Sequence, residues 1–199
     1  MSEVKLSCHC GEVRGLLTFK DKKSLSHIIC MCDDCQSFAH FLKREDEILD
    51  EFGGTEIYQV SSNEIQINRG REKIKCLKLS PKGICRFFAS CCNTPIANMV
   101  SLKVSFAGVV TDFIQDEDNQ LDRDIEYRCM SKYAKKEVIG NSSQGFSKLL
   151  TLKILKRVVL GYFNKRYLPN SFFDADSGNV LHEIVLVSKE KKEEIRESL

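Results

Sequence analysis

The sequence predicts a mainly β fold with an α/β appendage at its C-terminal end, and three observations lead to this prediction. Apolar residues occupy every second position through most of residues 55–88, which is the pattern of half-buried strands. Residues 145–165 instead carry apolar side chains at helical spacing. Seven of the ten cysteines fall into three short clusters, which indicates a domain stapled by metal.

The N-terminal elements are a predicted hairpin and a predicted buried strand. In residues 4–19 two short runs flank a Cys-Gly-Glu turn, where Gly11 can take the positive φ that a tight turn needs. The apolar run at residues 27–30 is expected to be a strand that leads into the second cysteine cluster. Asp33 and Asp34 are expected to form a turn there, because aspartate favours turns.

Four strands are predicted within residues 55–88, one for each alternating stretch: TEIYQV, EIQINR, KIKCLKL and GICRFF. Residues 97–113 predict one or two more strands, and the polar residues 116–124 predict an exposed loop. We therefore expect a metal-stapled β domain over residues 1–115. An α/β extension over residues 116–199 is expected to pack on it as part of one structural unit.

The C-terminal third begins with an amphipathic helix over residues 145–165, with lysine and arginine gathered on one side. We expect this helix to dock on its own domain and not to lie on an anionic membrane. A strand is predicted to follow within residues 180–187, and residues 189–199 are expected to form a charged surface helix or a frayed tail.

Composition and charge argue against several classes of protein. A formal net charge of +2 creates no field that would favour nucleic acid as a partner. No apolar run approaches the ~18 residues that a membrane span needs. The N-terminal residues lack a basic segment leading into an apolar one, so we expect a cytoplasmic protein. Cysteines in that reducing compartment indicate metal ligands before disulfides.

The clustered cysteines have spacings typical of zinc ligands. They are Cys8 and Cys10; Cys30, Cys32 and Cys35; and Cys91 and Cys92. In an extended chain, the two cysteines of a C-x-C pair point to the same face, about 6.6 Å apart at Cα, so both sulfurs can reach one ion. Adjacent cysteines face opposite ways and can share an ion only through a turn, which Asn93 permits by taking a left-handed conformation.

Counting ligands suggests that one metal site is open. Two tetrahedral ions need eight ligands and the clusters supply seven, so one coordination position remains, as in catalytic zinc sites. The natural partition is a closed site made by the first and third clusters and an open site made by the second. Cys91 is an alternative cap for the open site, and Cys85 is a reserve ligand. Cys76, Cys85, Cys129 and His40 are expected to be packed residues.

The three motifs resemble those of the glutathione-dependent formaldehyde-activating enzyme family, which also includes centromere protein V. The family pattern is C-x-C-G-x-V-R, then C-x-C-x-x-C, then F-C-x-x-C-G-T-P, and this chain has CHCGEVR, CMCDDC and FASCCNTP. In the third motif, Ala89 and Asn93 replace a cysteine and a glycine, and Cys91 is additional. The chain as a whole resembles an uncharacterised bacterial branch of that superfamily, a domain of unknown function.

This resemblance implies a β-tent fold of short sheets over a zinc ion. It implies a structural zinc held by the first and third clusters, with Cys91 in place of the thiolate missing at Ala89. It also implies a catalytic zinc at Cys30, Cys32 and Cys35. The implied reaction adds a thiol, with glutathione as co-substrate, to a small aldehyde, or cleaves such an adduct as a carbon–sulfur lyase. The alternatives are a non-catalytic zinc-stabilised binding or scaffold protein and, third, a redox or metal sensor.

Overall fold

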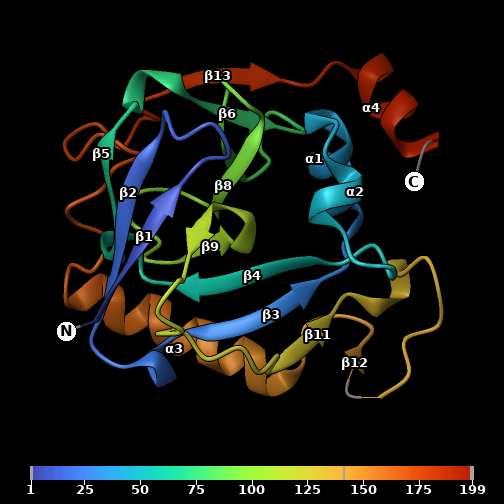
Figure 1. The fold of residues 1–199 in the computed structure, drawn as a ribbon, viewed down its shortest axis with the longest axis horizontal. Helices are drawn as coiled ribbons and strands as arrows, with labels where there is room; N and C mark the ends of the chain where they lie inside the picture. Colours follow the sequence, from blue (N-terminus) through green and yellow to red (C-terminus); the bar gives the residue numbers. More distant parts are fainter. Residues whose placement is uncertain (1, 141, 198–199) are drawn as a thin grey trace.

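The structure, a computed structural model, describes residues 2–140 and 142–197. These residues form two β-sheets of four and nine strands, with helices packed at the rim and across one face (Figure 1). The predicted mainly β fold is therefore confirmed.

The smaller sheet contains the predicted N-terminal hairpin. Its strands, in spatial order, are β10 (Ile114–Gln115), β1 (Ser2–Ser7), β2 (Arg14–Phe19) and β5 (Ile65–Arg69), all antiparallel. Lys5 lies opposite Leu16 in the hairpin, and Gly11 has the expected positive φ of 75°.

The larger sheet is antiparallel at its centre and gains parallel strands at both edges. Its order is β12 (Ser142–Ser143), β11 (Tyr127–Cys129), β3 (Ser26–Cys30), β4 (Thr55–Val60), β9 (Ala107–Val110), β8 (Thr94–Met99), β7 (Cys85–Ala89), β6 (Ile74–Lys78) and β13 (Glu183–Leu186). The edge strands β11, β12 and β13 all come from the C-terminal part of the chain. The four strands predicted from alternation are present, although β5 belongs to the smaller sheet.

Short 3-10 turns join several strands, at Lys22–Ser24, Ser62–Glu64, Arg71–Lys73, Thr111–Phe113 and Ser131–Tyr133.

The larger sheet has two different faces because side chains alternate along each strand. On β4, Tyr58 and Val60 belong to the main core, which lies between the two sheets. Ile57 and Gln59 line a cavity instead, and on β7 Phe87 and Arg86 divide in the same way. One face of the large sheet thus builds the core, and the other is available for a site.

The first helix corrects a prediction. The helices are α1 (Asp33–Leu42), α2 (Glu45–Ile48), α3 (Lys148–Phe163) and α4 (Lys189–Glu197). Asp33 and Asp34 do not form a connecting turn, because they are the first residues of α1. Cys32 is the N-cap of this helix, and its Sγ accepts a hydrogen bond from the Cys35 backbone N–H at 3.3 Å. Acidic residues suit a first turn because they face the positive end of the helix dipole.

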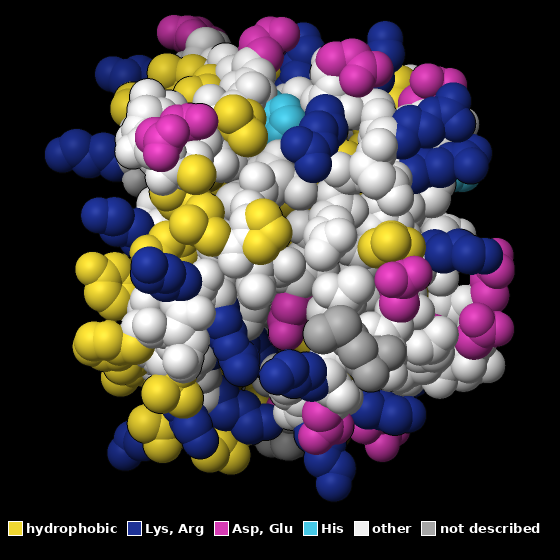
Figure 2. Space-filling view, turned by 90° about the vertical axis from the view of Figure 1, so that its left-hand side faces the viewer, with side chains coloured by type: hydrophobic (Ala, Val, Ile, Leu, Met, Phe, Trp, Pro, Cys, Tyr) yellow, Lys and Arg dark blue, Asp and Glu magenta, His cyan; other side chains and the backbone are white. Residues whose placement is uncertain are grey.

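The predicted C-terminal helix is confirmed as α3, which docks on the cavity face of the large sheet. Leu150 is fully buried, and Gly161 packs so closely against Ser105 that an added Cβ would overlap its hydroxyl. The outward side leaves Leu152 and Phe163 largely exposed. Hydrophobic side chains gather with lysines and arginines along the left-hand border of Figure 2. Within the described ranges, no helix combines the length and apolarity needed to span a bilayer.

Candidate metal centres

The first candidate centre brings together four cysteine sulfurs from segments far apart in the sequence. Cys8 and Cys10 come from the β1–β2 hairpin, and Cys91 and Cys92 from the turn between β7 and β8. Cys10 Sγ lies 3.6 Å from Cys8 Sγ and 3.2 Å from Cys91 Sγ. Cys91 Sγ lies 3.9 Å from both Cys8 Sγ and Cys92 Sγ. A tetrahedral zinc with Zn–S near 2.3 Å would separate its sulfurs by about 3.8 Å, so the four residues fit such an ion.

The turn that carries Cys91 and Cys92 is left-handed at Asn93, whose φ is 56°. Asparagine tolerates this conformation better than most residues, and its side-chain amide donates to the Leu42 carbonyl at 3.2 Å. Two adjacent cysteines therefore turn toward the same point, as the sequence requires if they are to share an ion. Ala89 ends β7 as a buried core residue, and Cys91 is the residue that joins the sulfur cluster.

Thr94 holds the Cys92 side of this cluster. Its hydroxyl lies 3.1 Å from Cys92 Sγ and also contacts the guanidinium of Arg44 at 2.9 Å and the His9 backbone N–H at 3.0 Å. Burial raises the pKa of Cys92, but hydrogen bonds from Thr94 and from the Cys10 backbone outweigh it and lower the pKa to about 6. These hydrogen bonds favour the thiolate form of Cys92, which is the form that binds metal.

The second candidate centre gathers three sulfurs at the junction of β3 and α1. Cys30 ends β3, Cys32 caps α1 and Cys35 lies in its first turn, with all three Sγ atoms within 4.8 Å of one another. Cys30 and Cys35 are buried. The local C-x-C-x-x-C segment therefore supplies three soft ligands at one point, which suits a thiolate-binding ion such as zinc.

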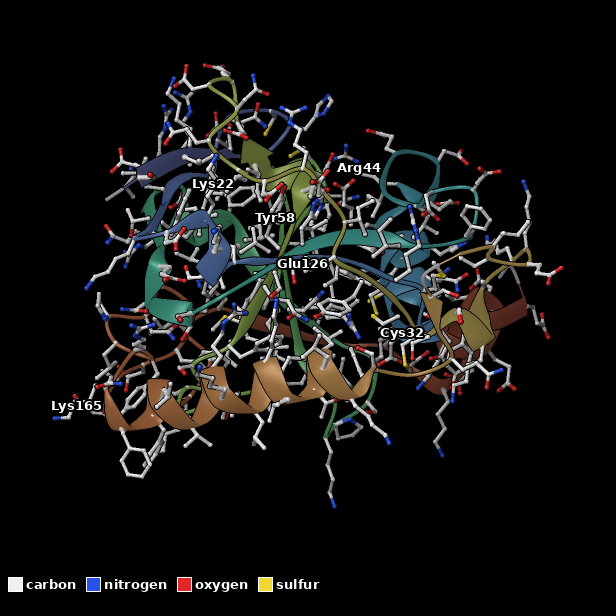
Figure 3. All side chains as sticks on the ribbon, turned by 90° about the horizontal axis from the view of Figure 1, so that it is seen from below. Lys22, Cys32, Arg44, Tyr58, Glu126 and Lys165 are labelled. Carbon is white, nitrogen blue, oxygen red and sulfur yellow. The ribbon has the colours of Figure 1, made fainter. Side chains whose placement is uncertain are left out.

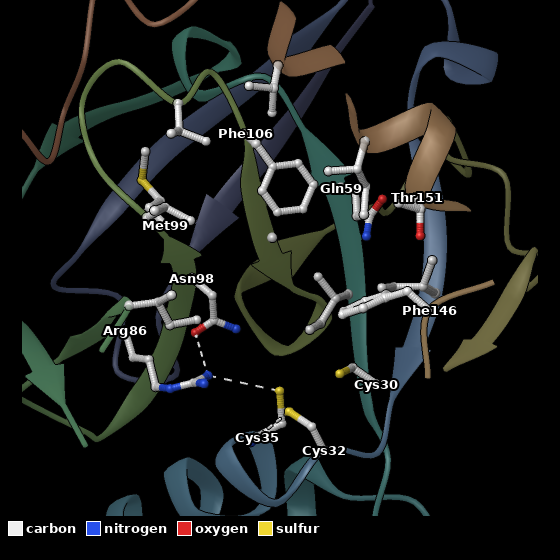
Figure 4. Close-up of a pocket in the computed structure, with 18 residues that line it drawn as sticks. Cys30, Cys32, Cys35, Gln59, Arg86, Asn98, Met99, Phe106, Phe146 and Thr151 are labelled. Carbon is white, nitrogen blue, oxygen red and sulfur yellow. Dashed lines mark hydrogen bonds between the residues drawn. The ribbon is translucent and has the colours of Figure 1, made fainter. Parts of the chain in front are cut away.

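Arg86 is the cation beside this trio (Figure 4). Its guanidinium, only 2% exposed, lies 3.9 Å from Cys35 Sγ. It donates to Asn98 Oδ1 at 3.3 Å and forms an ion pair with Asp34 at 3.2 Å. It also lies over the Phe38 ring. Three thiolates and a divalent ion carry a net charge of −1, which this buried arginine balances.

The thiols of the trio are protonated at neutral pH when no metal is bound. The neighbouring Cys30 thiol and burial raise the pKa of Cys35 to about 12, although Arg86 opposes this shift. The Cys30 thiol lowers the pKa of Cys32, but the Cys35 thiol and burial outweigh this effect. The pKa of Cys32 is therefore also raised, to about 12. Closely packed thiols disfavour one another's ionised forms because the thiolates would repel. A bound cation would instead favour the thiolates.

A cavity of about 480 Å³ lies directly above the trio, between the large sheet and α3 (Figure 4). Its walls are mostly aliphatic and aromatic side chains of β3, β4, β8, α3 and the adjoining loops. Cys30, Cys32 and Cys35 all contribute to its lining, at the end farthest from Phe106 and Gln59. From below, Cys32 lies near the N-terminal end of α3, and Lys165 follows its other end (Figure 3).

The remaining predicted residues lie outside both sulfur groups. Cys129 is fully buried, lies opposite Cys30 in the β11–β3 register and donates to the Ile29 carbonyl at 3.4 Å. Cys85 packs in the main core, as expected, on the side of the sheet away from the trio, so it is not a reserve ligand there. His40 lies 3.6 Å from Glu45 on the adjoining helix and is not in either sulfur group.

The sequence reasoning missed the polar residues of the cavity. They lie on predicted strands, at positions that alternate with the core-facing ones, where a two-layer fold would place solvent-facing side chains. These residues are Arg86, Asn98 and Gln59. The extension that covers this face with α3 is what buries them. Arg86 next to Cys85 in an otherwise apolar strand was the one available hint.

Comparison with known proteins assigns a family but no activity. A family described as a family of unknown function (DUF6151) matches residues 1–184, which include all seven clustered cysteines. A search of the curated proteins finds no match.

Proposed function

Since the chain belongs to this family of unknown function, its chemistry has to be inferred from its own sites, and we propose that it is a two-zinc protein. Cys8, Cys10, Cys91 and Cys92 would hold a structural zinc. Cys30, Cys32 and Cys35 would hold a second zinc that activates a thiol for addition to an aldehyde or for the reverse carbon–sulfur cleavage.

The observation that carries this proposal is the position of the trio at one end of a cavity. A zinc ion takes four ligands, and the three sulfurs that line the cavity supply three of them. The fourth ligand would then come from the cavity, which is the arrangement of a catalytic centre. The four-cysteine centre contains a full ligand set and suits a structural role.

In the proposed addition, the sulfur forms a bond to the carbonyl carbon while the C=O π pair moves to oxygen. The thiol loses one proton and the oxygen gains one, so nothing is oxidised or reduced. A zinc ion, when bound, supplies a lowered thiol pKa at neutral pH. The protein contributes the Arg86 charge, which offsets the anionic sulfurs, and apolar walls beside the reacting atoms.

The resemblance to the glutathione-dependent formaldehyde-activating enzymes supports the same division of roles. The mainly β fold and the pairing of an N-terminal C-x-C with a distant cysteine turn agree with a β-tent built over zinc, which we propose as the fold type. Cys91 would replace the thiolate missing at Ala89, and Asn93 keeps the left-handed turn at the family's glycine position.

Metal analysis combined with cobalt substitution tests this function. We expect two zinc ions per chain and, in the cobalt-substituted protein, a change in the visible spectrum when a small thiol is added. Cys32→Ser should remove one ion and the thiol response but preserve the fold. Cys10→Ala should unfold the N-terminal hairpin region. A wild-type spectrum that no thiol changes would contradict the proposed reaction.

The second candidate function is a non-catalytic zinc-stabilised scaffold, and Cys129 is the observation that favours it. Its thiol lies beside Cys30, and their interaction is the leading cause of the raised pKa of Cys30. Cys129 is not in the group of sulfurs that lie within 4.8 Å of one another, so its side chain would have to shift to complete the second centre and saturate both zinc ions. Cys129→Ser would then weaken the second zinc strongly, whereas the enzymatic proposal expects little change.

A further inference from the structure

The cavity above the trio is unusually poor in groups that bind a charged molecule. Among its 18 lining residues, Arg86 is the one cation, and there is no carboxylate. Arg86 already donates to Asn98 and pairs with Asp34. Glutathione would bring two carboxylates and an ammonium group into these walls, and burying such charges without partners is costly.

The walls instead match an extended apolar molecule. The apolar lining comes from several elements: Ile28 and Ile57 on the sheet, Phe106 in the loop before β9, and Ile154 and Val158 on α3. A volume near 480 Å³ is within the range of sites that enclose organic ligands of moderate size. Gly108 on β9 also lines this space, and a Cβ there would lie 2.9 Å from Ile57 Cγ2, so a larger residue would displace the Ile57 side chain.

Among the residues that line this space, Gln59 has a buried polar atom without a partner. Gln59 is only 2% exposed, and its Oε1 has no hydrogen-bond partner among the described residues. In the β3–β4 register, Gln59 pairs with Ser26 and Thr55 pairs with Cys30, four residues away along β3. At about 3.3 Å per residue, Gln59 lies roughly 13 Å along the sheet from the level of Cys30. A turn of this amide into the space would let the unpaired acceptor bind a hydrogen-bond donor at the far end of a ligand.

We propose that the cavity takes an apolar thiol, with its sulfur at the cysteine trio, its hydrocarbon body against α3 and a hydroxyl group at Gln59. This inference rests on the proposed thiol-activating function and changes the substrate class from glutathione to a lipophilic thiol. The selectivity comes from hydrophobic burial along the chain and from one hydrogen bond at its end.

The test uses mercaptoalkanols of increasing length, from mercaptoethanol to mercaptooctanol, with the cobalt-substituted full chain. We expect affinity to rise about fourfold per added methylene until the chain reaches Gln59, as full burial of a methylene implies. Glutathione should bind at least 100-fold more weakly than mercaptooctanol. Equal or tighter binding of glutathione would overturn the inference.

Two variants of α3 give a matched pair. Val158→Trp fills the cavity and should abolish the dependence on chain length, with both metal ions retained. Val159→Trp adds the same side chain on the outward side of the helix, where Val159 is 43% exposed, and should leave the dependence unchanged. Equal effects of the two variants would contradict binding in the cavity.

Gln59→Leu tests the hydrogen bond at the far end of the ligand. It should remove the difference in affinity by which mercaptohexanol binds more tightly than hexanethiol, and an unchanged difference would contradict the role of Gln59.

Alkanols separate this inference from the proposed function, because they lack the sulfur. If alkanols raise the melting temperature with the same chain-length dependence but thiols never change the cobalt spectrum, the apolar site is real and the thiol activation is wrong. If glutathione changes the spectrum and longer chains bind no better, the activation stands and the lipophilic substrate class is wrong.

Discussion

Replacing Arg86 with methionine should weaken metal binding at the three-cysteine centre and leave the fold intact. The guanidinium lies 3.9 Å from Cys35 Sγ. At an effective dielectric constant of about 20, a full unit charge at this distance contributes about 4 kcal/mol. The −1 charge of the loaded centre is spread over three sulfurs, and Asp34 already offsets part of the arginine charge. We therefore expect a loss of about 2 kcal/mol, or roughly 30-fold in zinc affinity.

Competition with a chromophoric zinc chelator measures this loss, and the titration step that Cys32→Ser removes identifies the three-cysteine centre. Arg69→Met, at an exposed arginine on β5, is the matched control and should change the affinity less than threefold. Asp34→Asn should instead raise the zinc affinity, because Arg86 loses its ion pair and more of its charge then acts on the sulfurs. A folded Arg86→Met protein with unchanged zinc affinity would refute the charge-balance argument.

Three further predictions concern protons and packing. At neutral pH the thiols of the trio are protonated, because the pKa values of Cys32 and Cys35 are raised to about 12 and that of Cys30 is also raised. Zinc binding there should release three protons, so the apparent zinc affinity should fall about 1000-fold for each pH unit of acidification. A fall of only about tenfold per pH unit would contradict this prediction. Thr94→Val removes a hydrogen bond that lowers the pKa of Cys92, so alkylation of this thiol in metal-free protein at neutral pH should slow several-fold. Gly161→Ala should cost about 1–3 kcal/mol in urea unfolding through its clash with Ser105, and an unchanged midpoint would contradict the close packing of α3.

Local patterns predicted most of the strands because alternation and turn chemistry are short-range properties. The hairpin around Gly11 and the strand that became β4 are examples in which sequence spacing alone suffices. The start of α1 was missed because a cysteine, Cys32, occupies the cap position usually filled by serine, threonine, aspartate or asparagine. A cysteine that caps a helix leaves no separate signal in a cysteine motif.

The cavity was not predictable from the sequence because it depends on long-range placement. Gln59 and Arg86 become buried only when α3, more than 60 residues further along the chain, covers their face of the sheet. Strand periodicity identifies two faces but does not say which one is covered by a later element. The membership of Cys91 in the first sulfur group was also open until the turn at Asn93 was known.

The two sulfur groups differ in how much chain separates their members, and this affects the order in which they can capture metal. Cys8 and Cys91 are 83 positions apart, whereas the trio lies within one short segment. Closing the longer loop costs about 2.5 kcal/mol more chain entropy than closing the shorter one. During synthesis the trio emerges first and can capture an ion before the sheet exists, whereas the four-sulfur group must wait for Cys92. When zinc is scarce, its final distribution between the two centres should depend on whether it is supplied before or after the chain folds.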